Sequence, residues 1–110
     1  MIGLIHEIEN IAKQYGLKIS SLDATDVTLM VRMEIMPSMF IQVYRNLKKN
    51  KLNMALILGN NRIYGADSEG GITHEHPVEH PESHILTEKE PELEEFIIKC
   101  LRFLQDRDIL

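Results

Sequence analysis

The two ends of the chain repeat apolar residues with the period of an α-helix. In residues 2–15 the apolar stripe consists of Leu4, Ile8, Ile11 and Tyr15. Gly16 follows as a C-terminal stop. Near the C-terminus a second stripe consists of Leu93, Phe96, Ile97, Cys100, Leu101 and Leu104. Pro91 precedes it and is well suited to the first position of a helix. The pattern therefore predicts one amphipathic helix at each end.

Between these segments the apolar period falls to two residues, which is typical of half-buried β-strands. In the clearest segment the apolar positions are Val27, Leu29, Val31, Met33 and Ile35. Residues 39–47 and 52–58 alternate in the same way, and residues 17–22 form a shorter strand before them. The sequence ITHEH, residues 72–76, is a candidate for a last, short strand. Leu56 is expected in the core of the sheet, facing the helices.

Turn signals suggest how these strands pair. An Asn-Asn turn at 60–61 suits a two-residue hairpin, because Asn tolerates positive φ better than most residues. That turn would pair Ile57 with Tyr64, and an earlier loop would pair Val43 with Leu56. The apolar side chains then expected on the outer face are Met30, Phe40, Tyr44, Ile57 and Tyr64. Such a face often marks a partner surface.

Together these elements predict an α+β fold. Its order is an N-terminal helix, an antiparallel meander of four to five strands, a histidine-rich loop and a C-terminal helix. Both helices are expected on one face of the sheet. Of the 110 residues, 44% are apolar and 26% charged, ordinary values for one globular domain spanning residues 1–110.

Charge is distributed unevenly along a chain whose net charge is −5. Residues 35–66 contain no acid, and their bases are Arg45, Lys48, Lys49, Lys51 and Arg62. An acidic protein is a poor general binder of nucleic acid. A local positive patch can nevertheless hold a phosphate.

Several sequence features bear on the cellular compartment. No apolar run approaches the ~20 residues of a membrane span. The N-terminus has no basic region of the kind that opens a signal peptide. The single Cys100 excludes an internal disulfide and fits a reducing compartment. We therefore expect a cytoplasmic protein that makes no membrane contact.

Four of the five histidines lie between Gly70 and His84. His74 and His76 are two residues apart, so on a strand they face the same way and can chelate zinc or nickel through imidazole. His80 or His84 would complete such a site. The spacing matches no closed structural zinc pattern, so a solvated turn that binds metal adventitiously is the second interpretation. No cofactor is expected to be required.

A histidine pair can also act as general base and acid, because imidazole titrates near neutral pH. Cleavage of RNA by its own 2′-hydroxyl needs such a pair and a cation on the phosphate. We expect His74 and His76 as the pair, with at least one imidazole within about 8 Å of Arg62 or Tyr64. Arg62 would hold the phosphate and Tyr64 would orient it. The expected substrate-binding residues are Arg45 and Tyr44, the latter by stacking on a base. The alternative is ordinary strand-end charge and sheet packing.

A longer pattern lies between Phe40 and His84. Its members are a strand, a hairpin carrying Arg62, Ile63, Tyr64, Gly65 and Asp67, and a terminal H-x-H-P of His74, His76 and Pro77. This plan resembles the TumE-like family, small prokaryotic proteins that are toxin partners in toxin–antitoxin pairs. The resemblance implies a cytoplasmic protein with a cognate antitoxin and nuclease-like action.

Two functional hypotheses follow. The first is a small toxin-like endoribonuclease that needs no metal, with His74 and His76 as its centre. The second is a partner-binding domain without enzymatic activity, in which the apolar outer face makes a homodimer or an antitoxin complex.

Overall fold

The computed structural model describes residues 1–69, 72–76, 85–87 and 92–110, with residues 72–76 and 85–87 described by their backbone alone. Two helices and seven strands occupy these residues. Their bounds are α1 Ile2–Gln14, β1 Lys18–Ala24, β2 Thr28–Met36, β3 Met39–Asn46, β4 Lys51–Leu58, β5 Asn61–Glu69, β6 Ile72–His76, β7 Ile85–Thr87 and α2 Leu93–Asp106.

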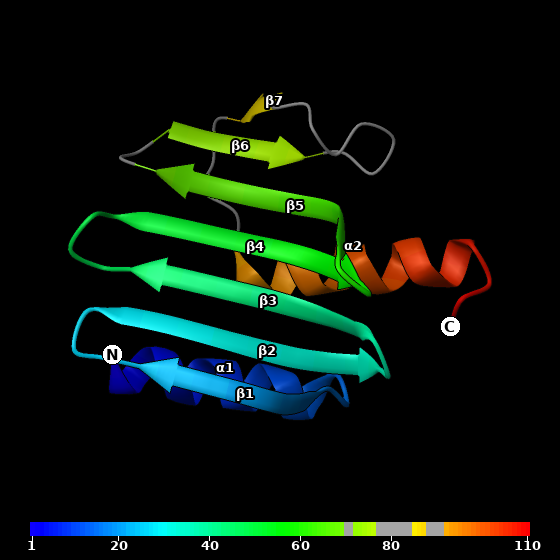
Figure 1. Ribbon diagram of the computed structural model, residues 1–110, viewed down its shortest axis with the longest axis horizontal. Helices are drawn as coiled ribbons and strands as arrows, with labels where there is room; N and C mark the ends of the chain where they lie inside the picture. The colour runs from blue at the N-terminus through cyan, green and yellow to red at the C-terminus, as the bar shows by residue number, and fades with distance from the viewer. Residues whose placement is uncertain (70–71, 77–84, 88–91) are drawn as a thin grey trace.

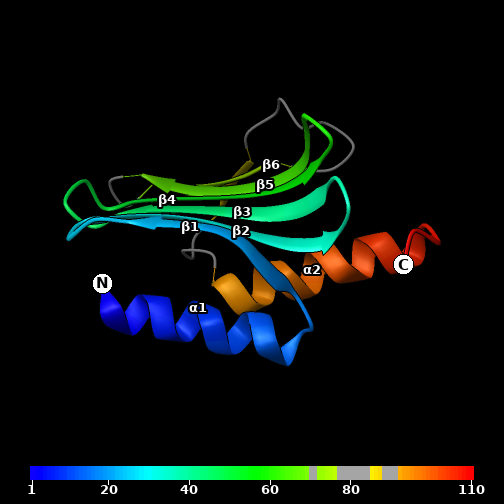
Figure 2. The same ribbon diagram turned by 60° about the horizontal axis from the view of Figure 1, so that its bottom comes forward.

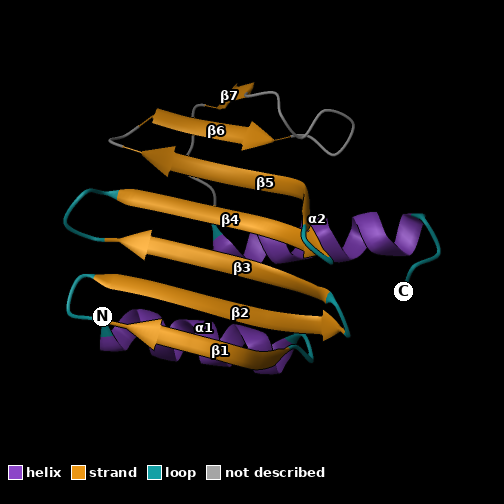
Figure 3. Cartoon of the chain, in the orientation of Figure 1, coloured by secondary structure: helices purple, strands orange, loops and turns teal. Residues whose placement is uncertain are grey.

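The elements form two layers. All seven strands belong to one sheet, in which each pairs antiparallel with the next along the chain. Both helices lie on the same face of that sheet (Figures 1 and 2). The predicted α+β class, the meander and the placement of the helices are confirmed. The sheet is wider than expected, because β7, which the sequence did not indicate, extends it beyond β6 (Figure 3).

Helix α1 ends as its sequence predicts. Gly16 adopts φ 69, a left-handed conformation that glycine takes without steric cost. The backbone N–H of Leu17 then donates to the carbonyl of Ala12 at 2.8 Å, which closes the helix with a Schellman-type bond. Because Leu17 is itself buried, this turn leads the chain directly from the helix into the core and on to β1.

Helix α2 buries the stripe that its periodicity indicates. Its fully buried side chains are Phe96, Ile97, Cys100 and Leu104. Glu94 and Glu95 stand in its first turn, where negative charge complements the helix dipole. The predicted start at Pro91 lies outside the described residues; the first helical residue is Leu93.

The inner face of the sheet supplies the other half of the core. Its buried side chains follow the predicted alternation along β2, β3 and β4, and they are Leu29, Val31, Met33, Ile41, Val43, Met54 and Leu56. Leu56 is 0% exposed, so its predicted place in the sheet core is confirmed. Val27 and Leu47, in contrast, are exposed, because both lie in turns just beyond the strands.

The predicted register of the β4–β5 hairpin is wrong. The turn uses Gly59, at φ 62, and Asn60, so it begins one residue earlier than an Asn-Asn turn would. Glycine adopts positive φ more readily than asparagine, which favours this choice. A bulge then follows, and Leu56 rather than Ile57 becomes the partner of Tyr64.

The bulge turns Tyr64 to the opposite face from the one predicted. Tyr64 is 7% exposed, and its ring stacks on Phe96 of α2 with centroids 5.2 Å apart. The prediction that Tyr64 belongs to the outer apolar face is therefore wrong. Ile63, next to it in the bulge, also packs against the core.

The β3–β4 register differs by two residues from the prediction. Val43 pairs with Met54 instead of Leu56, which pairs with Ile41. Because side chains alternate with a period of two, a two-residue shift leaves every side chain on its expected face. The burial prediction for Leu56 is therefore correct although its predicted partner is not.

No helix in the described part of the chain is long and apolar enough to span a membrane.

Candidate functional site

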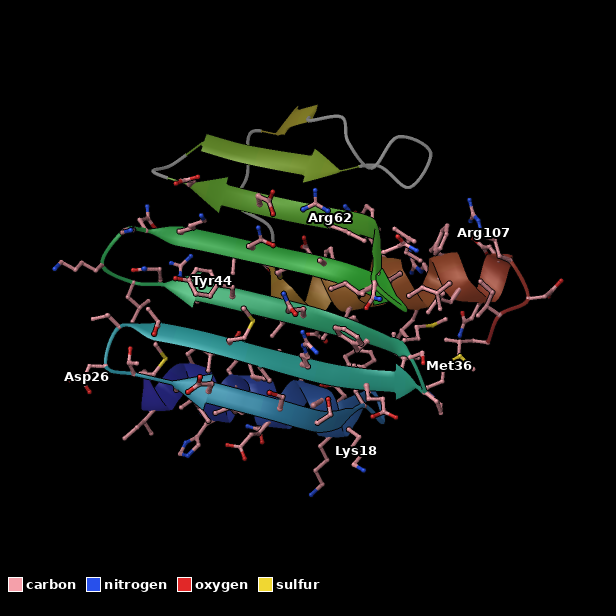
Figure 4. All side chains as sticks on the ribbon, in the orientation of Figure 1. Lys18, Asp26, Met36, Tyr44, Arg62 and Arg107 are labelled. Atoms are coloured by element: carbon pink, nitrogen blue, oxygen red, sulfur yellow. The ribbon has the colours of Figure 1, made fainter. Side chains whose placement is uncertain are left out.

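The face of the sheet opposite the helices, here called the open face, is covered by no described helix or strand (Figure 2). Its large apolar side chains are Met30, Phe40, Tyr44 and Ile57, all half-buried. These four residues are on the predicted face. Figure 4 shows Tyr44 on β3 and Arg62 on β5, both turned to the side away from the helices.

Strand pairing arranges the polar residues of the open face in two rows that cross the strands. The first, the Tyr44 row, runs through Met30, Tyr44, Asn53, Asp67 and His74. The second, the Gln42 row, runs through Arg32, Gln42, Ala55, Gly65 and His76. Each row connects side chains of β2 to β5 with one of the two histidines of β6. The predicted short strand at 72–76 is confirmed.

The side chains at the centre of the Gln42 row are short. Ala55 and Gly65 are buried although they belong to the open face, because they are much shorter than their neighbours. At one end of the row, the Nε of Arg32 donates to Oε1 of Gln42 at 3.1 Å. The Arg32 guanidinium also lies 4.7 Å from the centroid of the Phe40 ring, within cation–π range. Arg32 is thus an ordered cation on the open face.

Tyr44 is connected to the turn that follows its strand through the side chain of Asn46. The side-chain Nδ2 of Asn46 donates to the Tyr44 hydroxyl at 3.2 Å. Oδ1 of Asn46 accepts from the backbone N–H of Lys49 at 3.0 Å, in the turn between β3 and β4. Asn46 is buried and both bonds are partly shielded from water, which strengthens them.

Asp67 stands between Asn53 and His74 in the Tyr44 row. It is half-buried, and its Oδ1 is enclosed by protein atoms. A carboxylate next to a histidine can orient the imidazole and stabilise its charged form. A carboxylate can equally complete a metal site that contains two imidazoles.

Only some of the predicted site residues share this surface. Arg62 is exposed at the start of β5, paired with Ile57 on the open face. Tyr64 lies in the core between sheet and α2, so it is not available to orient a substrate on the open face. Tyr44 and Arg45 are consecutive in β3 and lie on opposite faces, so they do not form one binding surface.

Arg45 lies instead in a cleft between the helices and the sheet. The cleft has a volume of about 460 Å³ and is lined by Leu4, Glu7, Ile8, Ile11, Val43, Arg45, Leu47, Leu52, Met54, Glu92, Leu93 and Glu94. Its walls are aliphatic, and three glutamates accompany its single arginine. That balance of charge disfavours a phosphate, so the predicted role of Arg45 in binding a nucleotide has no support in its surroundings.

The two helices are also joined beside this cleft. The Tyr15 hydroxyl donates to Oε1 of Glu94 at 2.7 Å. This hydrogen bond, with smaller contributions from burial and the Glu94 charge, raises the pKa of Tyr15. The contact fixes the end of α1 against the start of α2, which is a structural role.

The remaining chemistry-bearing residues were the histidines and the cysteine. The side chains of His74 and His76 are outside the described residues, as are His80 and His84, so the predicted imidazole distances and metal contacts remain predictions. Among the side chains that are described, no group of three or more His, Cys, Asp or Glu could hold a metal ion. Burial raises the pKa of the Cys100 thiol, which makes it a poor nucleophile, as its place in the apolar stripe predicts.

Sequence reasoning missed several polar residues of the open face, namely Arg32, Gln42, Asn46, Asn53 and Asp67. The alternation assigned some of them to the outer face, but only the register shows that they are neighbours. Asp67 had one earlier signal, since it belongs to the pattern that resembles the TumE-like family. Comparison of the chain with protein-family models, curated proteins and solved structures finds no match.

Proposed function

We propose that this protein is a small toxin-like endoribonuclease of the cytoplasm, which acts on RNA held against the open face of its sheet. His74 and His76 are its general base and general acid. The observation that supports the proposal is the backbone register, which pairs His74 with Asp67 and His76 with Gly65. The two histidines thereby belong to the rows that contain Tyr44 and Gln42.

The reaction needs no cofactor. One histidine removes the proton of a ribose 2′-hydroxyl, and the oxygen attacks the adjacent phosphorus. The other histidine gives a proton to the departing 5′-oxygen, so the products are a cyclic phosphate end and a free 5′-hydroxyl. Arg62 stabilises the charge on the phosphate, and Asp67 orients the imidazole of His74.

The distribution of charge supports an anionic substrate on this face. The strands β3 and β4 contain no acid, and β5 has none before Asp67. Many of the acids lie instead in or next to the helices, on the far side of the sheet: Glu7, Glu9, Glu92, Glu94, Glu95 and Asp106. By register the open face also carries Asp23 and Glu34, beside Met30 and Phe40, and Asp67 and Glu69 on β5. The part of this face that favours an anion is therefore the centre formed by β3 and β4.

Incubation of the purified protein with single-stranded RNA in the presence of a chelator tests the proposal. We expect cleavage products with cyclic phosphate ends, and no cleavage of DNA, which lacks the 2′-hydroxyl. If cleavage occurs but the chelator stops it, the metal-independent mechanism is wrong. If RNA stays intact under all conditions, the enzymatic proposal is wrong.

The half-buried apolar residues of the open face support a second candidate, a binding domain that forms a homodimer or a complex with an antitoxin. In this case Ile57→Arg should convert a dimer to a monomer, as measured by light scattering at high micromolar concentration. Leu58→Arg is the matched control, because Leu58 is already 41% exposed at the strand end. A wild-type monomer that copurifies with no partner would contradict this candidate.

A further inference from the structure

We propose that Tyr44, Asn46 and the turn between β3 and β4 form a binding subsite for one nucleotide of single-stranded RNA. Tyr44 stacks on the base, the lysines of the turn contact the phosphates, and Asn46 positions the two parts relative to each other. The subsite takes its substrate class from the proposed function, but it does not depend on cleavage.

Tyr44 has the geometry of a stacking platform. It lies on β3, inside the sheet, between Met30 of β2 and Asn53 of β4 in its row. It is half-buried on a face that no described element covers. Single-stranded binding proteins use aromatic side chains on open sheets in this way, because every base has a face that can stack. Asn53 is the cross-strand partner of Tyr44 on β4, and a side-chain amide at that position can bond to a base edge.

The turn supplies the positive charge. Lys48 and Lys49 are exposed within it, and Lys51 follows as the first residue of β4, paired with Asn46. Asn50 takes φ 49 and lets the chain reverse tightly at this point. Two acids adjoin the turn: Glu69 pairs with Lys51 from the β5 side, and Asp26 precedes Val27, whose carbonyl accepts from the backbone N–H of Leu47. Three lysines within four residues still leave this end of β3 and β4 positive.

Asn46 connects the ring and the turn because an amide both donates and accepts. Its Nδ2 donates to the Tyr44 hydroxyl, and its Oδ1 accepts from Lys49. An aliphatic residue at this position could make neither bond. The side chain is buried and cannot contact a ligand directly, so its role is to hold the platform and the backbone of the basic turn in one arrangement.

The occupant is single-stranded RNA and not a duplex, since the bases of a duplex are already stacked and cannot cover the ring. A protein partner on the same surface would not depend on nucleobases. The subsite therefore predicts that affinity has two separable components. One depends on bases and Tyr44, and the other depends on charge and the turn.

The test uses a protein that cannot cleave, His74→Ala with His76→Ala, and a short dye-labelled oligoribonucleotide. Its control ligand is an abasic oligomer with the same number of phosphates. Tyr44→Ala should weaken oligoribonucleotide binding by roughly 5- to 150-fold, the effect of losing one base–aromatic stack, and leave abasic binding unchanged. Tyr15→Phe, on the helix layer, should change neither. Because the chain has no tryptophan, tyrosine fluorescence should be quenched by the oligoribonucleotide and not by the abasic oligomer.

The turn and Asn46 have their own readouts. Lys49→Gln should lower the slope of log affinity against log salt by about 0.7, the value for one phosphate contact to a single strand. Asn46→Ala should weaken binding more when Tyr44 is present than in the Tyr44→Ala protein, where only its bond to the turn is left to lose. A general loss of structure would instead weaken both backgrounds equally.

Equal affinity for the oligoribonucleotide and the abasic oligomer would overturn the subsite, as would a Tyr44→Ala protein that binds normally. Either result can occur while wild-type protein cleaves RNA, in which case the proposed function stands. Conversely, Tyr44-dependent binding by a wild-type protein that never cleaves would support the subsite and contradict the endoribonuclease.

Discussion

Replacing His74 with alanine is expected to lower RNA cleavage by roughly 100- to 10,000-fold, and the same range applies to His76, because each residue supplies one proton transfer. The proposed base and acid act in the same step. The double variant should therefore cleave RNA only a little more slowly than the slower of the two single variants. Rates of single-turnover cleavage on a defined RNA measure the effect. The wild-type rate should follow a bell-shaped pH profile, since one imidazole must be neutral and the other charged.

The matched control uses the other two histidines of the segment from Gly70 to His84. His80→Ala with His84→Ala removes two imidazoles beyond Pro77, and its cleavage rate should stay close to that of the wild type. Circular dichroism and RNA affinity confirm that each variant is folded and binds. Full activity in the His74→Ala and His76→Ala proteins would contradict the proposed centre and favour the partner-binding candidate.

Leu56→Ala is expected to lower the free energy of unfolding by about 2–5 kcal/mol, the range for removing a buried leucine side chain. Leu56 is 0% exposed, and it stands between Ile41 of β3 and Tyr64 of β5 on the face toward the helices. Its removal leaves a cavity in the middle of the sheet that rigid strands on both sides cannot fill. Urea unfolding followed by circular dichroism measures the change.

Leu58→Ala is the control for this prediction, because it makes the same substitution two residues further along β4. Leu58 is 41% exposed, so the change in the free energy of unfolding should stay within about 0.5 kcal/mol. If the two variants were equally stable, the burial assigned to Leu56 would be wrong.

The sequence alone was sufficient for the fold class, because each helix and each main strand repeats its apolar residues with its own period. The stripe from Phe96 to Leu104 and the alternation from Leu29 to Met33 both face the core as predicted. Gly16 marked the end of α1 correctly, since only a left-handed residue can close the helix there. The same alternation already implied that Tyr44 and Arg45 lie on opposite faces, so pairing them as one binding surface neglected information that the sequence contained.

Strand register was decided by tertiary structure. A turn at Gly59 and Asn60 differs little in backbone energy from one at Asn60 and Asn61, because both residue types tolerate positive φ. Packing of Tyr64 on Phe96, a contact between residues far apart in the sequence, accompanies the bulge that the structure adopts. The sequence of β5 does not predict that contact, and for this reason Tyr64 was assigned to the wrong face.

The candidate site, too, was determined in part by the sequence and in part by the tertiary structure. Periodicity alone determined that Tyr44, Phe40 and Ile57 share the open face, because alternation in a strand is a local property. Which residues become neighbours across that face depended on the pairing of five strands, each of which can slip by two residues without changing its buried side. The bonds that join Tyr44 through Asn46 to the basic turn are local, and the β5–β6 hairpin pairs Asp67 with His74. The assembled sheet decided which residues of the other strands are neighbours of Tyr44, namely Met30 and Asn53.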